Sequence, residues 1–427
     1  MKKIISSLFL LSIMLSAGAQ NIVNGELKAL LQQSLTYFPK VNEVEQSVQL
    51  AADRAKLTEL NKYPDVTIDA SYAYVQPKIE VPFGEKAFQF APEHNVSGAL
   101  NGSYILFDFG RLKTNIEKSK HELATATHVA EQLKVSLFTQ VSQLYFQIVF
   151  AKKAIEIQNQ VLQLLAENKT LLETQLKNGN AIQLDVLTIQ AKIDNEVNRK
   201  IDLQNNLDKL LNLLNYATGA KNIKEGELKL NVKSYTYDEA FQFALAHNPT
   251  LAIARDKVNI SKADVEISKI GLKPTVGLKA SVGSRNGYLP AINDPRFNYN
   301  AGIGFSVPLF NGGKTRQQIK IQEQGLALSE TNIAVIIHDT EKDIQGALID
   351  ITSNQNRIKN AATQIEQASL VQKLSVAKLK NGTATPIEIT SANADYQKAL
   401  LNQLLYQFQL CNAQLELAKA IGLEIIE

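Results

Sequence analysis

The chain has 427 residues, of which 45 are basic and 42 acidic, so its formal net charge is +3. This balance shows neither the basic excess typical of nucleic-acid binding nor an acidic tail, so we expect no nucleic acid among its partners. Trp is absent, and only 21 Gly and 11 Pro residues interrupt the chain, which predicts a helix-rich protein with few breaks.

The first 19 residues are typical of a secretory signal peptide. Lys2 and Lys3 form a positive start, Ile4 to Leu15 form an apolar run, and residues 17–19 (Ala-Gly-Ala) form a small-residue cleavage site. The run is too short for a transmembrane anchor, so we predict that residues 1–19 are removed and that the protein leaves the cytoplasm. No later run approaches the ~18 apolar residues of a spanning helix. If the mature chain enters a membrane, it must use strands closed into a barrel.

An internal repeat divides the rest of the chain. The tetrapeptide Leu-Lys-Asn-Gly occupies residues 176–179 and again residues 379–382, an offset of 203 (379 − 176). Gly219 and Gly422 share this offset. A constant offset without insertions is what two long helical hairpins of equal length would give, and such a repeat decides which fold is expected.

Upstream of these hairpins the offset becomes 210, as between Pro39 and Pro249 (249 − 39). The first unit therefore contains seven extra residues (210 − 203). We place them in the loop of its predicted strand hairpin, at about 76–95 against 286–298 in the second unit. The predicted domains are a first repeat at 20–219, a linker in the equatorial region at 220–236 and a second repeat at 237–427.

Each repeat is predicted to begin with one helix, at about Leu27–Lys62 and Asp238–Gly271, and to contain three further elements. The first repeat then has a strand hairpin at about 65–107, a long helix at about 110–178 and a return helix at about 183–218. The second has a strand hairpin at about 275–309, a long helix at about 313–381 and a return helix at about 386–421.

Alternating side chains predict the strands. Residues 65–74 put polar side chains on one face and apolar ones on the other, namely Val66, Ile68, Ala70, Tyr72 and Tyr74. Period two over this length is typical of a strand. Strands of about ten residues with two such faces fit a transmembrane barrel, and they also fit a soluble sheet with one buried face.

The spacing of apolar residues, alternately four and three positions apart, predicts coiled-coil packing in the first long helix. Between Leu137 and Leu176, apolar residues recur with a period of 3.5, and Gln158 and Lys169 fill the two gaps in the series. No Pro interrupts residues 110–179 or 313–382. At ~1.5 Å per residue each long helix would extend on the order of 100 Å, which predicts a rod or tube rather than a compact domain.

Four strands in one chain cannot close a barrel, because the smallest barrels have about eight. An open sheet in lipid would leave two edges with unsatisfied backbone groups. If the strands lie in a membrane, several chains must share one barrel, and their helices must close into a tube. Such an assembly would be a conduit from the periplasm to the exterior.

The chain resembles TolC-like outer-membrane efflux proteins over almost its whole mature length. The motifs that carry the resemblance are Pro308-Leu309-Phe310-Asn311-Gly312-Gly313, Leu106-Phe107-Asp108-Phe109-Gly110, Ala246-His247-Asn248-Pro249 and the two Asn-Gly tips. Their order and the fixed offset are more specific than any one of them.

The resemblance implies a mainly α fold with β, in which a unit of one β-hairpin and one coiled-coil helical hairpin is duplicated. Three such chains would form a 12-stranded β-barrel that continues into a periplasmic α-helical barrel. It implies a passive outer-membrane channel of a Gram-negative bacterium, in a tripartite efflux or type I secretion system. The implied partners are outer-membrane lipid, a periplasmic adaptor (membrane fusion) protein and an inner-membrane pump.

The resemblance also implies two sets of site residues. Those of the pore aperture are Asp185, Glu388 and Ser391, and those of the adaptor-docking tips are Asn178, Gly179, Asn381, Gly382 and Thr383. Ser391 stands where the family has a second acid, and Ala384 stands where its best-known member has a basic residue that ties the tips shut. We therefore expect closure to rest on coiled-coil packing.

Plainer roles compete with these assignments. An acid in the first turn of a helix is favoured by the helix dipole, which would explain Asp185 and Glu388. Gly179 and Gly382 could be ordinary helix-ending glycines. The competing function is a secreted periplasmic structural coiled-coil or adaptor protein whose strands form a soluble sheet.

Enzyme chemistry finds no support in the sequence. His121 and His128 share a helix face, but no third metal ligand stands near them in the chain. No phosphate loop, nucleophile elbow or catalytic carboxylate pair is present, so we expect no catalytic residue, cofactor or metal. Asp108 and Asn311 are interpreted as turn or cap residues, and Cys411, on an apolar helix stripe, as a core residue.

Overall fold

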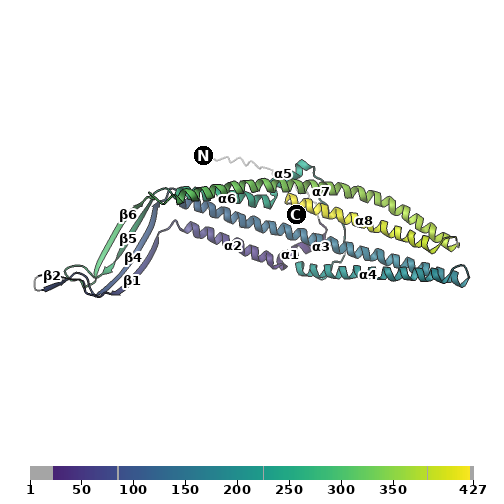
Figure 1. Ribbon diagram of the computed structural model, residues 1–427, viewed down its shortest axis with the longest axis horizontal. Helices are drawn as coiled ribbons and strands as arrows, with labels where there is room; N and C mark the ends of the chain where they lie inside the picture. Colours follow the sequence, from purple (N-terminus) through teal and green to yellow (C-terminus); the bar gives the residue numbers. More distant parts are fainter. Residues whose placement is uncertain (1–22, 84–85, 225, 382, 424–427) are drawn as a thin grey trace, which may run out of the picture. The chain divides into compact units, whose positions relative to one another are not determined.

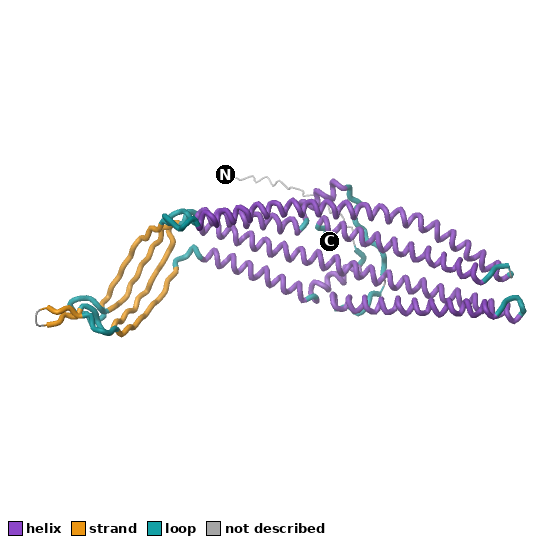
Figure 2. Tube along the Cα trace, viewed as in Figure 1, coloured by secondary structure: helices purple, strands orange, loops and turns teal. Residues whose placement is uncertain are grey.

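The computed structural model describes residues 23–83, 86–224, 226–381 and 383–423. The predicted signal peptide at 1–19 and the predicted tip residue Gly382 lie outside these ranges. Figure 1 shows the order of the elements, and Figure 2 shows that loops in the described ranges mainly connect helices and strands.

Three of the four helices in each repeat match their counterparts in length. The first repeat comprises α1 (Gly25–Tyr37), α2 (Pro39–Leu60), β1 (Asp65–Tyr74), β2 (Glu80–Phe83), β3 (Lys86–Gln89), β4 (His94–Phe107), α3 (Arg111–Lys177) and α4 (Gln183–Thr218). The second comprises α5 (Tyr237–His247), α6 (Pro249–Ile270), β5 (Thr275–Arg285), β6 (Arg296–Ser306), α7 (Lys314–Lys380) and α8 (Pro386–Ile421). Helices α3 and α7 have 67 residues each, α4 and α8 have 36, and α2 and α6 have 22. These three pairs of helices have equal lengths and occur in the same order, as expected for a duplicated unit.

The expectation of one unbroken helix at the start of each repeat is wrong. The structure has α1 and α2 in place of a helix at 27–62, and α5 and α6 in place of one at 238–271. The breaks fall at Phe38 (φ −79°, ψ 113°) and Asn248 (φ −71°, ψ 117°), each of which precedes a proline. A proline ring clashes with a helical residue before it, so both residues adopt extended backbone.

Strands of both repeats form one antiparallel sheet in the order β1-β4-β5-β6. The central pair, β4 with β5, joins the first repeat to the second. The first loop between hairpin strands contains the separate two-stranded hairpin β2-β3. This hairpin accounts for the longer first loop, whose counterpart at 286–295 has no strand.

The compact units of the structure do not coincide with the repeats. One unit comprises residues 1–42, 131–249 and 338–427, and the other comprises residues 43–130 and 250–337. Each unit therefore contains residues from both repeats, and the division into repeats stays a prediction from the sequence.

The largest core of the first unit surrounds α3. Tyr145 and Phe146 are fully buried there. The predicted linker contributes Ile223 and Leu230 to the same core. Lys152 donates hydrogen bonds to the Ile223 carbonyl oxygen (2.6 Å) and the Asn222 side chain (3.0 Å). The linker is thus packed onto the helices rather than free of them.

Two glycines end the return helices in the same way. Gly219 follows α4 with φ +77°, and Gly422 follows α8 with φ +72°. A Cβ on Gly219 would lie 2.9 Å from the Tyr37 ring, and a Cβ on Gly422 would lie 2.5 Å from the His247 carbonyl oxygen. Tyr37 and His247 are 210 residues apart (247 − 37), so each return helix ends on the equivalent point of its own repeat.

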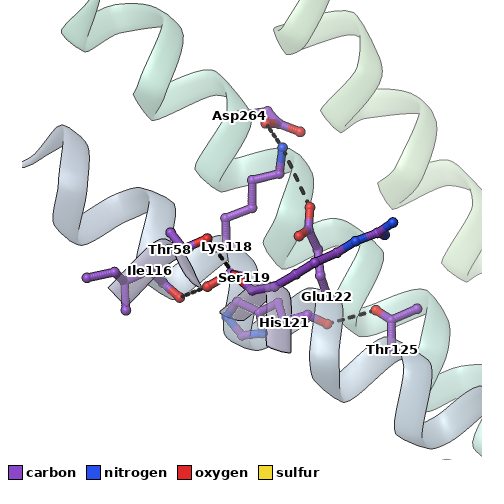
Figure 3. A network of polar contacts seen from close by, with 9 residues as sticks. Thr58, Ile116, Lys118, Ser119, His121, Glu122, Thr125 and Asp264 are labelled. Carbon is purple, nitrogen blue, oxygen red and sulfur yellow. Dashed lines mark hydrogen bonds and ion pairs between the residues drawn. The ribbon is translucent and has the colours of Figure 1, made fainter. Parts of the chain in front are cut away.

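In the second unit, polar contacts tie α3 to α6. Figure 3 shows the Lys118 ammonium group between two carboxylates, at 2.7 Å from Asp264 and 3.8 Å from Glu122. Asp108 caps the start of α3, since its carboxylate accepts hydrogen bonds from the backbone N–H groups of Gly110 (3.0 Å) and Leu112 (2.7 Å). Within the described ranges, no helix combines the length and the hydropathy that crossing a lipid bilayer requires.

Candidate functional site

One face of the four-stranded sheet is apolar and open. The register aligns Ile68, Leu100, Val282 and Tyr299 in a row across all four strands. Ile68 is 82% exposed and Tyr299 is 79% exposed. Other large apolar side chains on this face are exposed as well: Val66, Tyr72, Tyr74, Val96, Leu278, Phe297, Ile303 and Phe305. A contiguous exposed apolar surface of this kind marks a site that contacts another protein, a ligand or a membrane.

The opposite face of the same sheet is hydrophilic. The adjacent row is Thr67, Asn101, Ser281 and Asn300. The Asn101 amide donates to the Asp69 carboxylate at 2.6 Å, and the hydroxyl groups of Ser71 and Ser97 lie 2.8 Å apart. Polar side chains that bond one another across strands suit a surface in contact with water.

The sheet has two free edges. Strands β1 and β6 are its first and last members, and in the described residues neither pairs along its outer side. A row of unpaired N–H and C=O groups is a template for pairing with another strand. The sheet is therefore incomplete as an isolated four-stranded element.

The tip between α3 and α4 ends α3 with a left-handed glycine. Gly179 has φ +77°, and its N–H donates to the Leu176 carbonyl oxygen at 3.1 Å. The Asn180 N–H donates to the Gln175 carbonyl oxygen at 2.8 Å. These bonds satisfy carbonyl groups at the helix end, so Gly179 ends the helix. Asn178 is exposed beside it.

The tip between α7 and α8 exposes Asn381 and Thr383. Thr383 donates two hydrogen bonds to the Lys378 carbonyl oxygen, from its backbone N–H (2.9 Å) and its hydroxyl (3.1 Å). These bonds hold Thr383 against the last turn of α7. Both tips thus present small polar side chains on hydrogen-bonded turns.

The acidic residues predicted at the aperture each cap their own helix. The Asp185 carboxylate accepts from the Ile182 N–H at 3.1 Å. Glu388 accepts from the Thr385 N–H at 3.1 Å, and the Thr385 hydroxyl accepts from the Glu388 N–H at 3.3 Å. This is a capping box. Ser391 is exposed one turn further along, and the aperture role of all three stays a prediction.

A buried apolar cluster joins the two hairpins near their tips. It contains residues from all four helices: Val161, Leu165, Leu172, Val186, Ile189, Leu379 and Ile389. Ala384 packs against it. Beside the cluster, the Gln175 side-chain amide donates to the Leu379 carbonyl oxygen at 2.6 Å. This bond was not foreseen, because nothing in the sequence near Gln175 indicates a partner on α7.

Residues considered for enzyme chemistry have structural partners. Asp256 of α6 lies 2.8 Å from His128 and 3.7 Å from His121, so the structure brings a carboxylate to histidines that had no third residue near them in the chain. In the described part of the chain, no group of three or more such side chains could hold a metal ion. Cys411 is buried, and burial raises the pKa of its thiol to about 12.

Comparison with known proteins gives a consistent result. The profile of the family described as "Outer membrane efflux protein" matches residues 30–220 and 240–423. The alkaline protease secretion protein AprF of Pseudomonas aeruginosa is 24% identical over 309 residues, which cover 66% of this chain and 64% of AprF, slightly under two thirds of its length. The cation efflux system protein CusC of Escherichia coli is 20% identical over 385 residues, 87% of this chain and 80% of CusC.

A solved structure of CusC superimposes with a TM-score of 0.83 at 18% identity, over 94% of this chain and 93% of that chain. At this identity the superposition shows the fold. The predicted fold class, mainly helical with a duplicated strand hairpin and helical hairpin, is confirmed.

Proposed function

Because this chain belongs to the outer membrane efflux protein family, we propose that it is the passive exit duct of a tripartite efflux or type I secretion system. The protein is an outer-membrane channel of a Gram-negative bacterium with a helical periplasmic extension. The finer statement, that it docks to a periplasmic adaptor and serves an inner-membrane pump, is our proposal. It is supported by the similarity to AprF, an alkaline protease secretion protein, and to CusC, a cation efflux system protein.

The two-faced sheet carries the proposal. In a homotrimer, β1 of each copy would pair with β6 of the next, and three four-stranded sheets would form twelve strands (3 × 4) without a free edge. The apolar row through Ile68 and Tyr299 would face lipid, and the polar row through Thr67 and Asn300 would line water. Closure removes the cost of unsatisfied backbone groups in lipid, and alternation of this kind is typical of transmembrane barrels.

The hairpin tips support the docking part of the proposal. The described tip residues Asn178, Gly179, Asn381 and Thr383 are exposed, and apolar side chains beside them, Leu184 and Ile387, are exposed as well. We propose that an adaptor binds these turns; Gly382, predicted for the same role, lies outside the described residues. Asp185, Glu388 and Ser391 would surround the aperture at the start of the return helices.

One experiment tests membrane insertion through the two faces of β6. We expect Ile303→Asp to abolish the heat-modifiable trimer in outer-membrane fractions, because a carboxylate on the lipid face is costly. Asn300→Asp, three residues earlier on the polar face, is the matched control and should leave trimer and single-channel conductance intact. Equal tolerance of both substitutions, or recovery of the wild-type protein in the soluble periplasm, would contradict the proposal.

A further inference from the structure

A charged polar layer lies inside the helical hairpins, where apolar packing was expected. Gln158, one of the two residues that interrupt the apolar series on α3, is 1% exposed. Glu196 on α4 and Gln397 on α8 are each 4% exposed. Three buried polar side chains thus meet from three helices, and α8 belongs to the second repeat.

Hydrogen bonds connect the three side chains directly. The Gln158 amide donates to the Glu196 carboxylate at 2.9 Å and to the Glu196 carbonyl oxygen at 2.8 Å. The Gln397 amide donates to the Gln158 side-chain oxygen at 2.9 Å and to the Glu196 carboxylate at 3.5 Å. Lys192, one turn away on α4, lies 3.0 Å from the other carboxylate oxygen. Each Glu196 oxygen therefore has a partner.

The layer is ionised at neutral pH. Burial alone would raise the pKa of Glu196, but the hydrogen bond from Gln158, the contact with Lys192 and the bond from Gln397 together lower it. A buried carboxylate needs this set of donors, because an unpaired buried charge is strongly unfavourable. Any movement of α8 that removes Gln397 weakens the set.

Polar and apolar contacts constrain α8 differently. The apolar cluster nearer the tips, with Leu165, Ile189 and Ile389, is non-directional and tolerates small shifts along the helix axis. The polar layer is directional, and a shift leaves buried donors and acceptors unpaired. Single buried polar groups fix register in coiled coils for this reason. Gln158, Glu196 and Gln397 therefore set the position of α8.

Within the described residues, three side chains of α8 have buried polar atoms without a hydrogen-bond partner, namely Asn393, Gln409 and Asn412. Asn393, one turn before Gln397, is 3% exposed, and neither its amide nitrogen nor its amide oxygen has a hydrogen-bond partner. A buried amide without partners costs free energy. An arrangement in which Asn393 gains a partner would recover that cost.

We propose that Gln158, Glu196 and Gln397 form a latch that holds α8, and with it the predicted aperture residues Glu388 and Ser391, against the first hairpin. The channel opens when α8 leaves the latch. This inference rests on the proposed function, since it needs an aperture to control. Glu196 is a positioning residue in this scheme, because it acts on the aperture through α8.

Single-channel recording of the full-length protein in planar bilayers tests the latch. We expect Glu196→Leu to raise the open-to-closed ratio roughly tenfold, the effect of losing a hydrogen bond to a charged group. Glu196→Gln keeps the shape and one acceptor oxygen, so it should restore most of the closed state. Asp194→Leu, which removes an exposed carboxylate two residues earlier on α4, is the matched control and should gate like the wild type.

A triple variant separates gating from folding. Gln158→Leu, Glu196→Leu and Gln397→Leu together replace the layer by apolar packing, which is often neutral for stability but has no fixed register. We expect a heat-modifiable trimer of normal helix content with a raised open-to-closed ratio. A stable triple variant that gates like the wild type would overturn the latch. A wild-type protein that forms no channel would overturn the proposed function and the latch with it.

Discussion

The side-chain amide of Gln175 donates a hydrogen bond of 2.6 Å to the backbone carbonyl oxygen of Leu379, which joins the last turn of α3 to the last turn of α7. Leu379 is itself buried in the apolar cluster that both hairpins share. Ala384, which stands where the best-known member of the family has a basic residue, packs against the same cluster. A neutral side chain thus bridges the hairpin ends in a protein without that base.

Loss of this bridge should loosen the tips. Gln175→Leu removes one neutral hydrogen bond, worth about 1 kcal/mol, so we expect backbone amides of residues 174–181 to exchange roughly fivefold faster. Hydrogen exchange with mass spectrometry measures this without reference to conductance. Gln163→Leu, an exposed change on the same helix, should leave exchange at the tip unaltered. Unchanged exchange in Gln175→Leu would show that the bond does not hold the hairpins together.

Charge at the aperture can be separated from helix capping. Glu388→Gln keeps a side-chain oxygen that can accept the Thr385 N–H, so α8 should remain capped. If Glu388 faces the ion path, the loss of its charge should weaken block of the single channel by divalent cations. Asp185→Asn makes the same test at the first tip. Block that is identical in wild type and both variants would remove these residues from the aperture.

Gly422 should tolerate no side chain. Alanine would have to adopt φ +72°, and its Cβ would lie 2.5 Å from the His247 carbonyl oxygen. We expect Gly422→Ala to destabilise the fold by about 1–3 kcal/mol, visible as a lower Tm of the purified protein. Gly346→Ala is the control, because no atom lies within 4 Å of its added Cβ, and alanine in a helix is favoured by up to about 1 kcal/mol.

The latch should weaken in acid. The pKa of Glu196 is lowered in the folded protein from its ordinary value of 4.5. A lowered folded-state pKa means that ionised Glu196 stabilises the fold above pH 4.5, and that this contribution disappears as the pH falls through the folded-state pKa. The Tm difference between wild type and Glu196→Gln should therefore be constant from pH 7 to about 5 and shrink below 4.5. A difference independent of pH would contradict the ionised layer.

The fold class was predictable because its signals are periodic. Alternation marked the strands, a 3.5-residue period marked α3, and the constant offset showed the duplication. The breaks at Phe38 and Asn248 were missed although Pro39 and Pro249 were visible, since tertiary packing decides whether a proline bends a helix or ends it. The hairpin β2-β3 was not foreseen, because four-residue strands leave almost no periodic signal.

The candidate site was harder to foresee, because its contacts link distant parts of the chain. Gln158 was visible as a gap in the apolar series, but its partners Glu196 and Gln397 lie on two other helices. His121 and His128 were seen as neighbours, and their shared partner Asp256 follows more than a hundred residues later. Helix faces can be predicted from one segment, whereas the pairing of faces depends on how separate segments dock.

The pairing of β4 with β5 has a consequence for how the protein is made. These strands belong to different repeats, so the sheet cannot form until the second repeat has crossed the inner membrane as far as the end of β6 at Ser306. Until then β1 and β4 form at most a two-stranded hairpin, which is marginally stable alone and has an exposed apolar face. Non-local pairing of this kind is slow and prone to aggregation. We therefore expect the half-exported chain to need protection from aggregation until β5 and β6 arrive.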